Sequence, residues 1–118
     1  MSAKVQLVKD LVAMHPALED EYECHVFNEG EVLAYVFFWD VVQEVVAACL
    51  AQESEGLDWQ SVLDFLETQL VREVPSVRSV ICTSFLLNLP HPGKPGHEIV
   101  DSLGPAMARK FQELRPLG

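Results

Sequence analysis

Positive charge is missing from more than half of this sequence. Between Asp10 and Val71 there is no Lys or Arg, whereas the same stretch, called here the acidic segment, holds 14 Asp and Glu residues. The flanks, residues 1–9 and 72–118, carry a formal charge of +2 each, and the whole chain carries −10. Because proteins neutralise nucleic-acid phosphates with Lys and Arg, this absence excludes DNA and RNA as partners of the acidic segment.

Long apolar stretches are also missing. The longest run, residues 32–39, is followed by Asp40 and interrupted again at Glu44, so it falls short of the roughly 20 residues that cross a bilayer. The N-terminal pattern contains Lys4 and Lys9, unlike the unbroken apolar region of a signal peptide. We therefore expect a cytoplasmic protein without a membrane span.

Motifs that carry known chemistry are absent as well. The four histidines show no HExxH spacing, and no GxSxG, P-loop or GxGxxG pattern occurs. Paired carboxylates are too common in so acidic a chain to single out a catalytic dyad. The three cysteines form no CxxC pair, and we interpret them as reduced core thiols: Cys24, Cys49 and Cys82. The sequence thus predicts no enzymatic activity, no metal site and no cofactor.

What is present is helical periodicity. Apolar residues recur every three or four positions in segments bounded by the N-cap residues Ser2 and Asp58, by Gly30, and by Pro90. We predict an all-α fold, a single domain over residues 1–118 with about six helices around a central apolar one. The predicted helices span residues 3–14, 16–29, 31–52, 59–71, 77–89 and 98–114, the last broken at Gly104 and Pro105. Residues 54–56 end the third helix, and residues 90–96, rich in Pro and Gly, form a loop.

The third helix is the prediction with a competing alternative. Residues 32–38 are rich in β-branched and aromatic side chains, which favour strands. The apolar pattern nevertheless continues to Gln52 without a turn signal, and strands are rarely that long. We therefore predict a helix that is apolar on most sides because other helices surround it.

The acidic segment is the feature most informative about function. Acids in the first turn stabilise a helix through its macrodipole, and a low isoelectric point is common among bacterial proteins, so part of the pattern needs no partner. A field of one sign also attracts a cationic protein and speeds its association. Tryptophan is enriched at protein interfaces. The predicted partner-binding residues are Glu19, Asp20, Glu21, Glu23, Glu29, Glu31, Asp40 and Trp39.

Four segments together carry a family resemblance. They are residues 18–22 (LEDEY), 35–40 (YVFFWD), 84–90 (SFLLNLP) and 103–105 (LGP). In this order they resemble a family of small all-helical bacterial domains of unknown function, which look like immunity proteins of polymorphic toxin systems; where that pattern has a small residue, this chain has Trp39. The resemblance implies a cytoplasmic antitoxin that covers the active site of a toxin. Many such toxins are nucleases whose basic clefts suit an acidic inhibitor.

Two other functions remain open. Residues 62–89 resemble one helical hairpin of a HEAT-type repeat, with Arg78 in the place of the hallmark arginine, which fits an adaptor that binds another protein. There is a single copy, whereas a repeat array needs about three. Alternatively, the aromatic residues between Tyr35 and Trp39 could line a small-molecule pocket, although a central helix more often buries such residues in its core.

Overall fold

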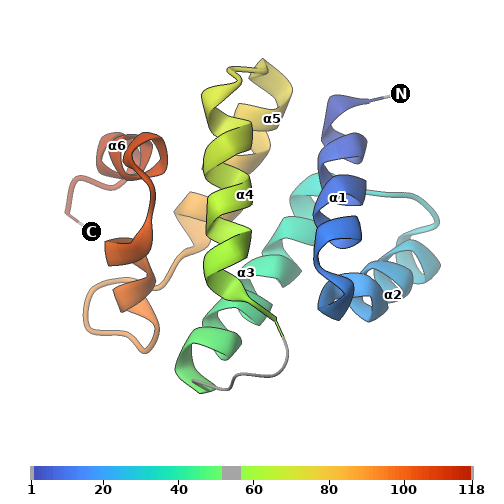
Figure 1. Cartoon of the computed structure of the whole chain (residues 1–118), viewed down its shortest axis with the longest axis horizontal. Coiled ribbons are helices and arrows are strands. Elements are labelled where there is room, and N and C mark those ends of the chain that lie inside the picture. The colour runs from blue at the N-terminus through green and yellow to red at the C-terminus, as the bar shows by residue number, and fades with distance from the viewer. Residues whose placement is uncertain (1, 52–56, 118) are drawn as a thin grey trace.

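The chain folds entirely into helices and loops, as a computed structural model that describes residues 2–51 and 57–117 shows (Figure 1). The all-α prediction is confirmed, and no strand occurs in those two ranges. In Figure 1, α1 and α2 lie at one side, α4 and α5 in the middle and α6 at the opposite side, while α3 runs diagonally behind α1 and α4. The α-helices are α1 (Ala3–Met14), α2 (Glu19–Glu29), α3 (Ala34–Ala51), α4 (Trp59–Val71), α5 (Pro75–Val80) and α6 (Pro105–Leu114).

Local capping fixes the helix ends that the sequence marks. The Ser2 hydroxyl accepts a hydrogen bond from the Lys4 backbone N–H, and Asp58 Oδ1 accepts one from the Ser61 N–H, each at 3.2 Å. Gly30 ends α2 with φ of 76°, a left-handed conformation that glycine adopts without steric cost. These three predictions are confirmed, whereas the predicted helix end at residues 54–56 lies outside the described residues.

Helix α3 is central but is not surrounded. Its buried side chains join one apolar core with α1, α4 and α5, and Phe37 and Phe38 are fully buried within it. Its opposite face is exposed, so the prediction of burial on most sides is wrong for that face. The described elements cover only one side of α3, because its buried residues all fall within one half of its circumference on a helical wheel. By length and composition alone, α3 meets the criterion for a membrane span, as core helices of soluble proteins also do.

The predicted fifth helix is not one regular helix. After α5, the backbone widens into a π-type turn, η2 (Ile81–Phe85), and then tightens into a 3₁₀ turn, η3 (Leu86–Asn88). The Asn88 side-chain amide donates to the Ser84 carbonyl at 2.8 Å, and Pro90 supplies no N–H to continue the ladder. The chain therefore satisfies its terminal carbonyls without α-helical geometry.

The C-terminal part is attached by two charged side chains. Glu67 of α4 accepts hydrogen bonds from the N–H groups of Ala106 and Met107, both at 2.9 Å, and so caps α6. Gly104 makes room for this contact, since a Cβ there would lie 2.5 Å from Glu67 Cδ. The predicted helix over residues 98–103 is a 3₁₀ segment, η4 (His97–Ser102), and the predicted break before α6 is confirmed.

Arg115 is the second attachment. Its guanidinium is buried and donates to the backbone carbonyls of Leu86, Leu89 and Pro90 at 3.1, 2.7 and 3.3 Å. It also donates to His91 Nδ1 at 2.9 Å. Through these bonds one side chain holds the residues that follow α6 against the start of the Pro/Gly loop.

The Pro/Gly loop, residues 90–96, ends against α3. Gly96 has φ of 90° and lies so close to that helix that a Cβ would approach Val46 Cγ1 to 2.8 Å. Only glycine fits both the conformation and the space. The loop thus closes over one edge of α3 and leaves the rest of that helix's outer face uncovered by the described residues.

Candidate partner-binding surface

The acidic residues of α2 lie on both flanks of the helix. At 100° per residue, Glu19 and Glu23 fall on the flank toward α1, whereas Glu21 falls on the flank toward α3. Asp20 lies on the exposed side between them. The buried face that divides the flanks carries His25. The predicted contact residues therefore form separate groups and not one acidic face.

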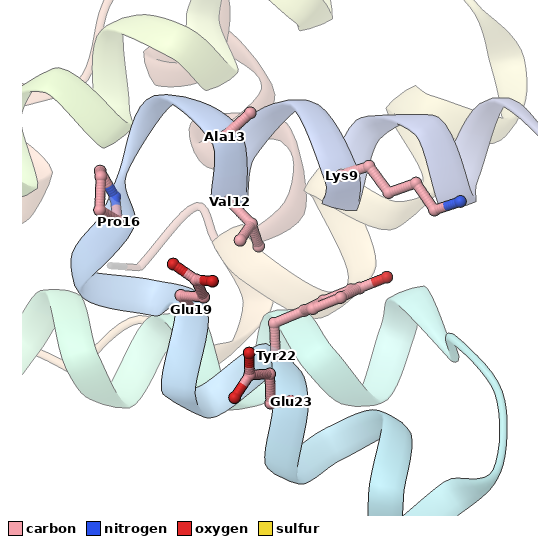
Figure 2. A pocket seen from close by; sticks show the side chains of 7 residues that line it. All are labelled: Lys9, Val12, Ala13, Pro16, Glu19, Tyr22 and Glu23. Carbon is pink, nitrogen blue, oxygen red and sulfur yellow. The ribbon is translucent and has the colours of Figure 1, made fainter.

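The first group borders a hollow between α1 and α2 (Figure 2). It has a volume of about 390 Å³. In Figure 2, the carboxylates of Glu19 and Glu23 rise from α2 on one side, and Val12 faces them from α1. The residues that line the hollow are Lys9, Val12, Ala13, Pro16, Glu19, Tyr22 and Glu23.

The chemistry of this hollow suits a basic side chain. Val12 and Pro16 offer apolar surface to the alkyl stem of a Lys or Arg, and the two carboxylates can accept hydrogen bonds from its cationic head. Glu19 and Glu23 are spaced four residues apart on one helix, where like charges repel by a few tenths of a kcal/mol. A cation between them relieves that repulsion.

The second group gathers where α2 meets α3. Burial, a hydrogen bond with Glu44 and the charges of Glu44 and Asp20 raise the pKa of Glu21. Burial raises the pKa of Asp40, and the charge of Glu21 adds to this while nearby His25 opposes it. Three carboxyl groups, those of Glu21, Asp40 and Glu44, thus crowd one seam.

Glu44 is absent from the predicted contact residues. The sequence does hold a signal for it, because Glu44 follows Asp40 by four positions on one helix and must share its face.

The remaining predicted residues lie around α3. Glu29 and Glu31 are exposed at the turn between α2 and α3, and Glu31 borders a second hollow of about 420 Å³ that also contains Lys4 and Tyr35. Trp39 is exposed over half of its surface. Neither Glu29 nor Glu31 lines the hollow between α1 and α2, so these acids extend the surface without joining that site.

The aromatic segment does not form one pocket. Phe37 and Phe38 point into the core, and Phe37 meets Tyr22 and Phe38 edge to face at ring distances of 5.9 and 6.2 Å. Tyr35 and Trp39 lie outside. The Tyr35 hydroxyl is hydrogen-bonded to Ser79 Oγ at 2.8 Å. The segment therefore divides between the core and the surface, as alternate sides of a helix require.

The histidines whose hydrogen bonds the structure describes link separate parts of the backbone. Buried His25 accepts the Leu33 N–H at 2.9 Å through Nε2, just before α3 begins. His97 Nδ1 donates to the Pro90 carbonyl at 2.8 Å. Burial lowers the pKa of His15. Within residues 2–51 and 57–117, no three His, Cys, Asp or Glu side chains are grouped so that they could hold a metal ion.

The three thiols differ in environment. Cys49 is buried, as predicted, and Cys82 is partly buried. Burial raises the pKa of both thiols, which keeps them protonated. Cys24 is exposed on α2, so the prediction of a core position is wrong for this residue. Cys24 falls on the solvent side because it precedes buried His25 by one position, a rotation of 100°.

Comparison with known proteins adds no relative. The chain matches no protein-family model, no curated protein sequence and no solved structure.

Proposed function

We propose that this protein is a non-catalytic immunity protein that binds and neutralises a basic bacterial toxin domain, acting in the cytoplasm. The observation that carries the proposal is the acid-lined hollow between α1 and α2, with Glu19 and Glu23 at its rim. The hollow is of a size and chemistry to receive a Lys or Arg side chain. A toxin that acts on nucleic acid presents such side chains in its substrate cleft, because phosphate binding requires them.

The wider acidic surface supports fast capture. Asp20, Glu29 and Glu31 add exposed negative charge beyond the hollow, which Lys9 also lines, in a segment that itself contains no Lys or Arg. Such a field raises association rates by 10-fold to 1,000-fold at low ionic strength and loses its effect as salt screens it. An inhibitor that must act before a toxin damages its host benefits from this steering.

The test uses the product of the gene immediately upstream as the candidate toxin. Its expression alone is expected to arrest growth, and co-expression of this chain is expected to restore it. Association is then measured by stopped flow at low and high salt, with Glu19→Lys/Glu23→Lys compared with Glu98→Lys/Asp101→Lys. Both pairs change the net charge equally, but Glu98 and Asp101 are exposed outside the acidic segment.

The first pair is expected to slow association at low salt about 10-fold to 100-fold, and the control pair less than about threefold. Stability is expected to change by less than about 0.5 kcal/mol per substitution, because all four side chains are exposed. Equal association rates for the two pairs would contradict the role of the hollow. Failure of the upstream product to bind at all would contradict the immunity function.

A further inference from the structure

A stripe that is apolar except at Gln43 runs along the outer face of α3. Val36, Trp39 and Leu50 are exposed over 43, 50 and 46% of their surfaces. Gln43 and Ala47 lie between them and are also exposed. On a helical wheel these five residues fall within about 80° of one another, so they form a continuous row. We call this row, Val36, Trp39, Gln43, Ala47 and Leu50, the α3 stripe.

The stripe has the dimensions of a helix-binding surface. It spans 14 residue steps, which at 1.5 Å per residue gives about 21 Å, or roughly four helical turns. Its members recur at three- and four-residue spacing, the pattern that receives the ridges of another helix. Ala47 leaves a low point between Trp39 and Leu50 into which a larger side chain can fit.

The two borders of the stripe are unlike. Asp40 and Glu44 lie along one edge, with Glu21 of α2 close beside them. The other edge carries Tyr35 and Val46, and the Pro/Gly loop packs against Val46. A partner that fits is apolar along one face and positively charged along the adjoining edge.

We infer that the α3 stripe is the docking site for a basic amphipathic helix of the protein partner. Its apolar face covers Val36, Trp39 and Leu50, and its Lys or Arg residues pair with the carboxylates of Asp40 and Glu44. This inference rests on the proposed function, because it assigns the same partner a second contact. The α3 stripe differs from the hollow between α1 and α2, because burial of apolar surface supplies most of its attraction for the partner.

The charges argue against the two other occupants of such a surface. A second copy of this chain also carries −10, and an antiparallel pairing of two α3 helices brings Asp40 and Glu44 against the same residues of the other copy. The anionic lipids of a cytoplasmic membrane surface repel the same border. The same acidic residues that repel a second copy and an anionic membrane attract a basic helix.

The test uses a defined probe and the emission of Trp39. The probe is an 18-residue amphipathic peptide of Leu and Lys in heptad spacing, and its control has Glu in place of Lys. Trp59→Phe leaves Trp39 as the single tryptophan. Binding at physiological salt is expected to shift the Trp39 emission to shorter wavelength and to raise the helical content of the Lys peptide, while the Glu peptide is expected not to bind.

Matched variants then locate the site by calorimetry. Trp39→Ser and Leu50→Ser are each expected to weaken binding of the Lys peptide about tenfold or more, as loss of an interface anchor does. Phe27→Ser is the control, because Phe27 is 89% exposed on α2, outside the stripe, and is expected to change the affinity less than twofold. Circular dichroism of each variant confirms that its fold is retained.

In the experiments with the peptides, the free chain and vesicles, three results would overturn the inference: equal affinities for the stripe variants and Phe27→Ser, self-association of the free chain that Trp39→Ser abolishes, or transfer of Trp39 into anionic vesicles. The same variants tested against the upstream gene product separate the two proposals. Normal binding by the stripe variants would overturn the docking inference and leave the immunity function intact. A basic peptide bound at the stripe by a chain that does not bind the toxin would overturn the immunity function alone.

Discussion

The acidic segment and the C-terminal part of the chain use their charges in opposite ways. In the acidic segment, Glu19, Asp20 and Glu23 are exposed to solvent. In the C-terminal part, Arg115 is buried to 8% exposure and binds three backbone carbonyls. Within the described residues the one ion pair, Lys110 with Glu113 at 3.3 Å, also lies in the C-terminal part.

This difference separates charges that build the fold from charges that are free for a partner. Glu67 shows the distinction inside the acidic segment itself, because its carboxylate is fully used in capping α6. In the C-terminal part, Arg78 and Arg109 are charges that the fold does not use in this way, because both are exposed and border a hollow of about 330 Å³. The fold needs few of the acidic side chains, and like charges at close spacing destabilise it slightly. In the function proposed above, the acids that the fold does not require are the ones that bind the cationic partner.

Removing the buried Arg115 guanidinium is expected to have the largest effect on stability. Arg115→Met keeps most of the apolar stem but leaves the carbonyls of Leu86, Leu89 and Pro90 without their donor. We expect a loss of about 3 kcal/mol in the free energy of unfolding, measured by urea denaturation. Arg109→Met is the control, because that side chain is exposed, and a loss of similar size there would mean that charge and not the buried bonds is responsible.

Glu67→Gln is expected to have an intermediate effect. A carboxylate accepts from both N–H groups at the start of α6, whereas a carboxamide offers one oxygen and turns its own N–H₂ toward the other donor. We expect urea denaturation to show a loss of about 1.5 kcal/mol. Asp64→Asn on the exposed side of α4 is the matched control and is expected to change stability by less than about 0.5 kcal/mol. An unchanged midpoint for Glu67→Gln would mean that α6 is held by its apolar contacts alone.

The smallest effect is expected for Glu21→Gln, and it should depend on pH. Because the pKa of Glu21 is raised above its ordinary 4.5 in the folded chain, folding favours the protonated carboxyl. Its stabilising contribution is present below pH 4.5 and is lost as the pH rises through the raised value. Glu21→Gln is therefore expected to stabilise the protein at pH 7 by about 0.5 kcal/mol, a figure kept small because the group is partly solvated.

The same variant is expected to match the wild type at about pH 4, where Glu21 is protonated. Urea denaturation at the two pH values measures the difference. Glu98→Gln, an exposed control in the C-terminal part, is expected to show no such pH-dependent gain. If Glu21→Gln raised the free energy of unfolding equally at both pH values, packing and not charge repulsion would account for the gain where α2 meets α3.

The parts of the fold that follow from neighbours in sequence could be predicted. The caps at Ser2 and Asp58 act over two and three residues, and Gly30 ends its own helix, so the sequence alone specifies them. The attachments made by Glu67 and Arg115 could not be predicted, because they join residues 39 or 40 and 24 to 29 positions apart.

The same limit applies to the candidate site: its composition could be predicted from the sequence, but its arrangement in space could not. The acidic segment is visible in the sequence, but the division of its carboxylates between two flanks of α2 depends on which face packs inward. The sequence predicts Trp39 and Asp40 at an interface, but the extent of the exposed face of α3 could not be predicted, because apolar residues occur on most sides of that helix and hide which side its neighbours leave open.

Gly96 brings the end of the Pro/Gly loop into close approach to Val46 of α3. A Cβ on residue 96 would lie 2.8 Å from the Val46 methyl, so only the absence of a side chain at Gly96 lets the loop pack this close to that helix. The loop in turn shares the Pro90 carbonyl with both His97 and Arg115. The contacts of this loop therefore link the outer edge of α3 to the residues that follow α6, on the side of the molecule away from α1 and α2.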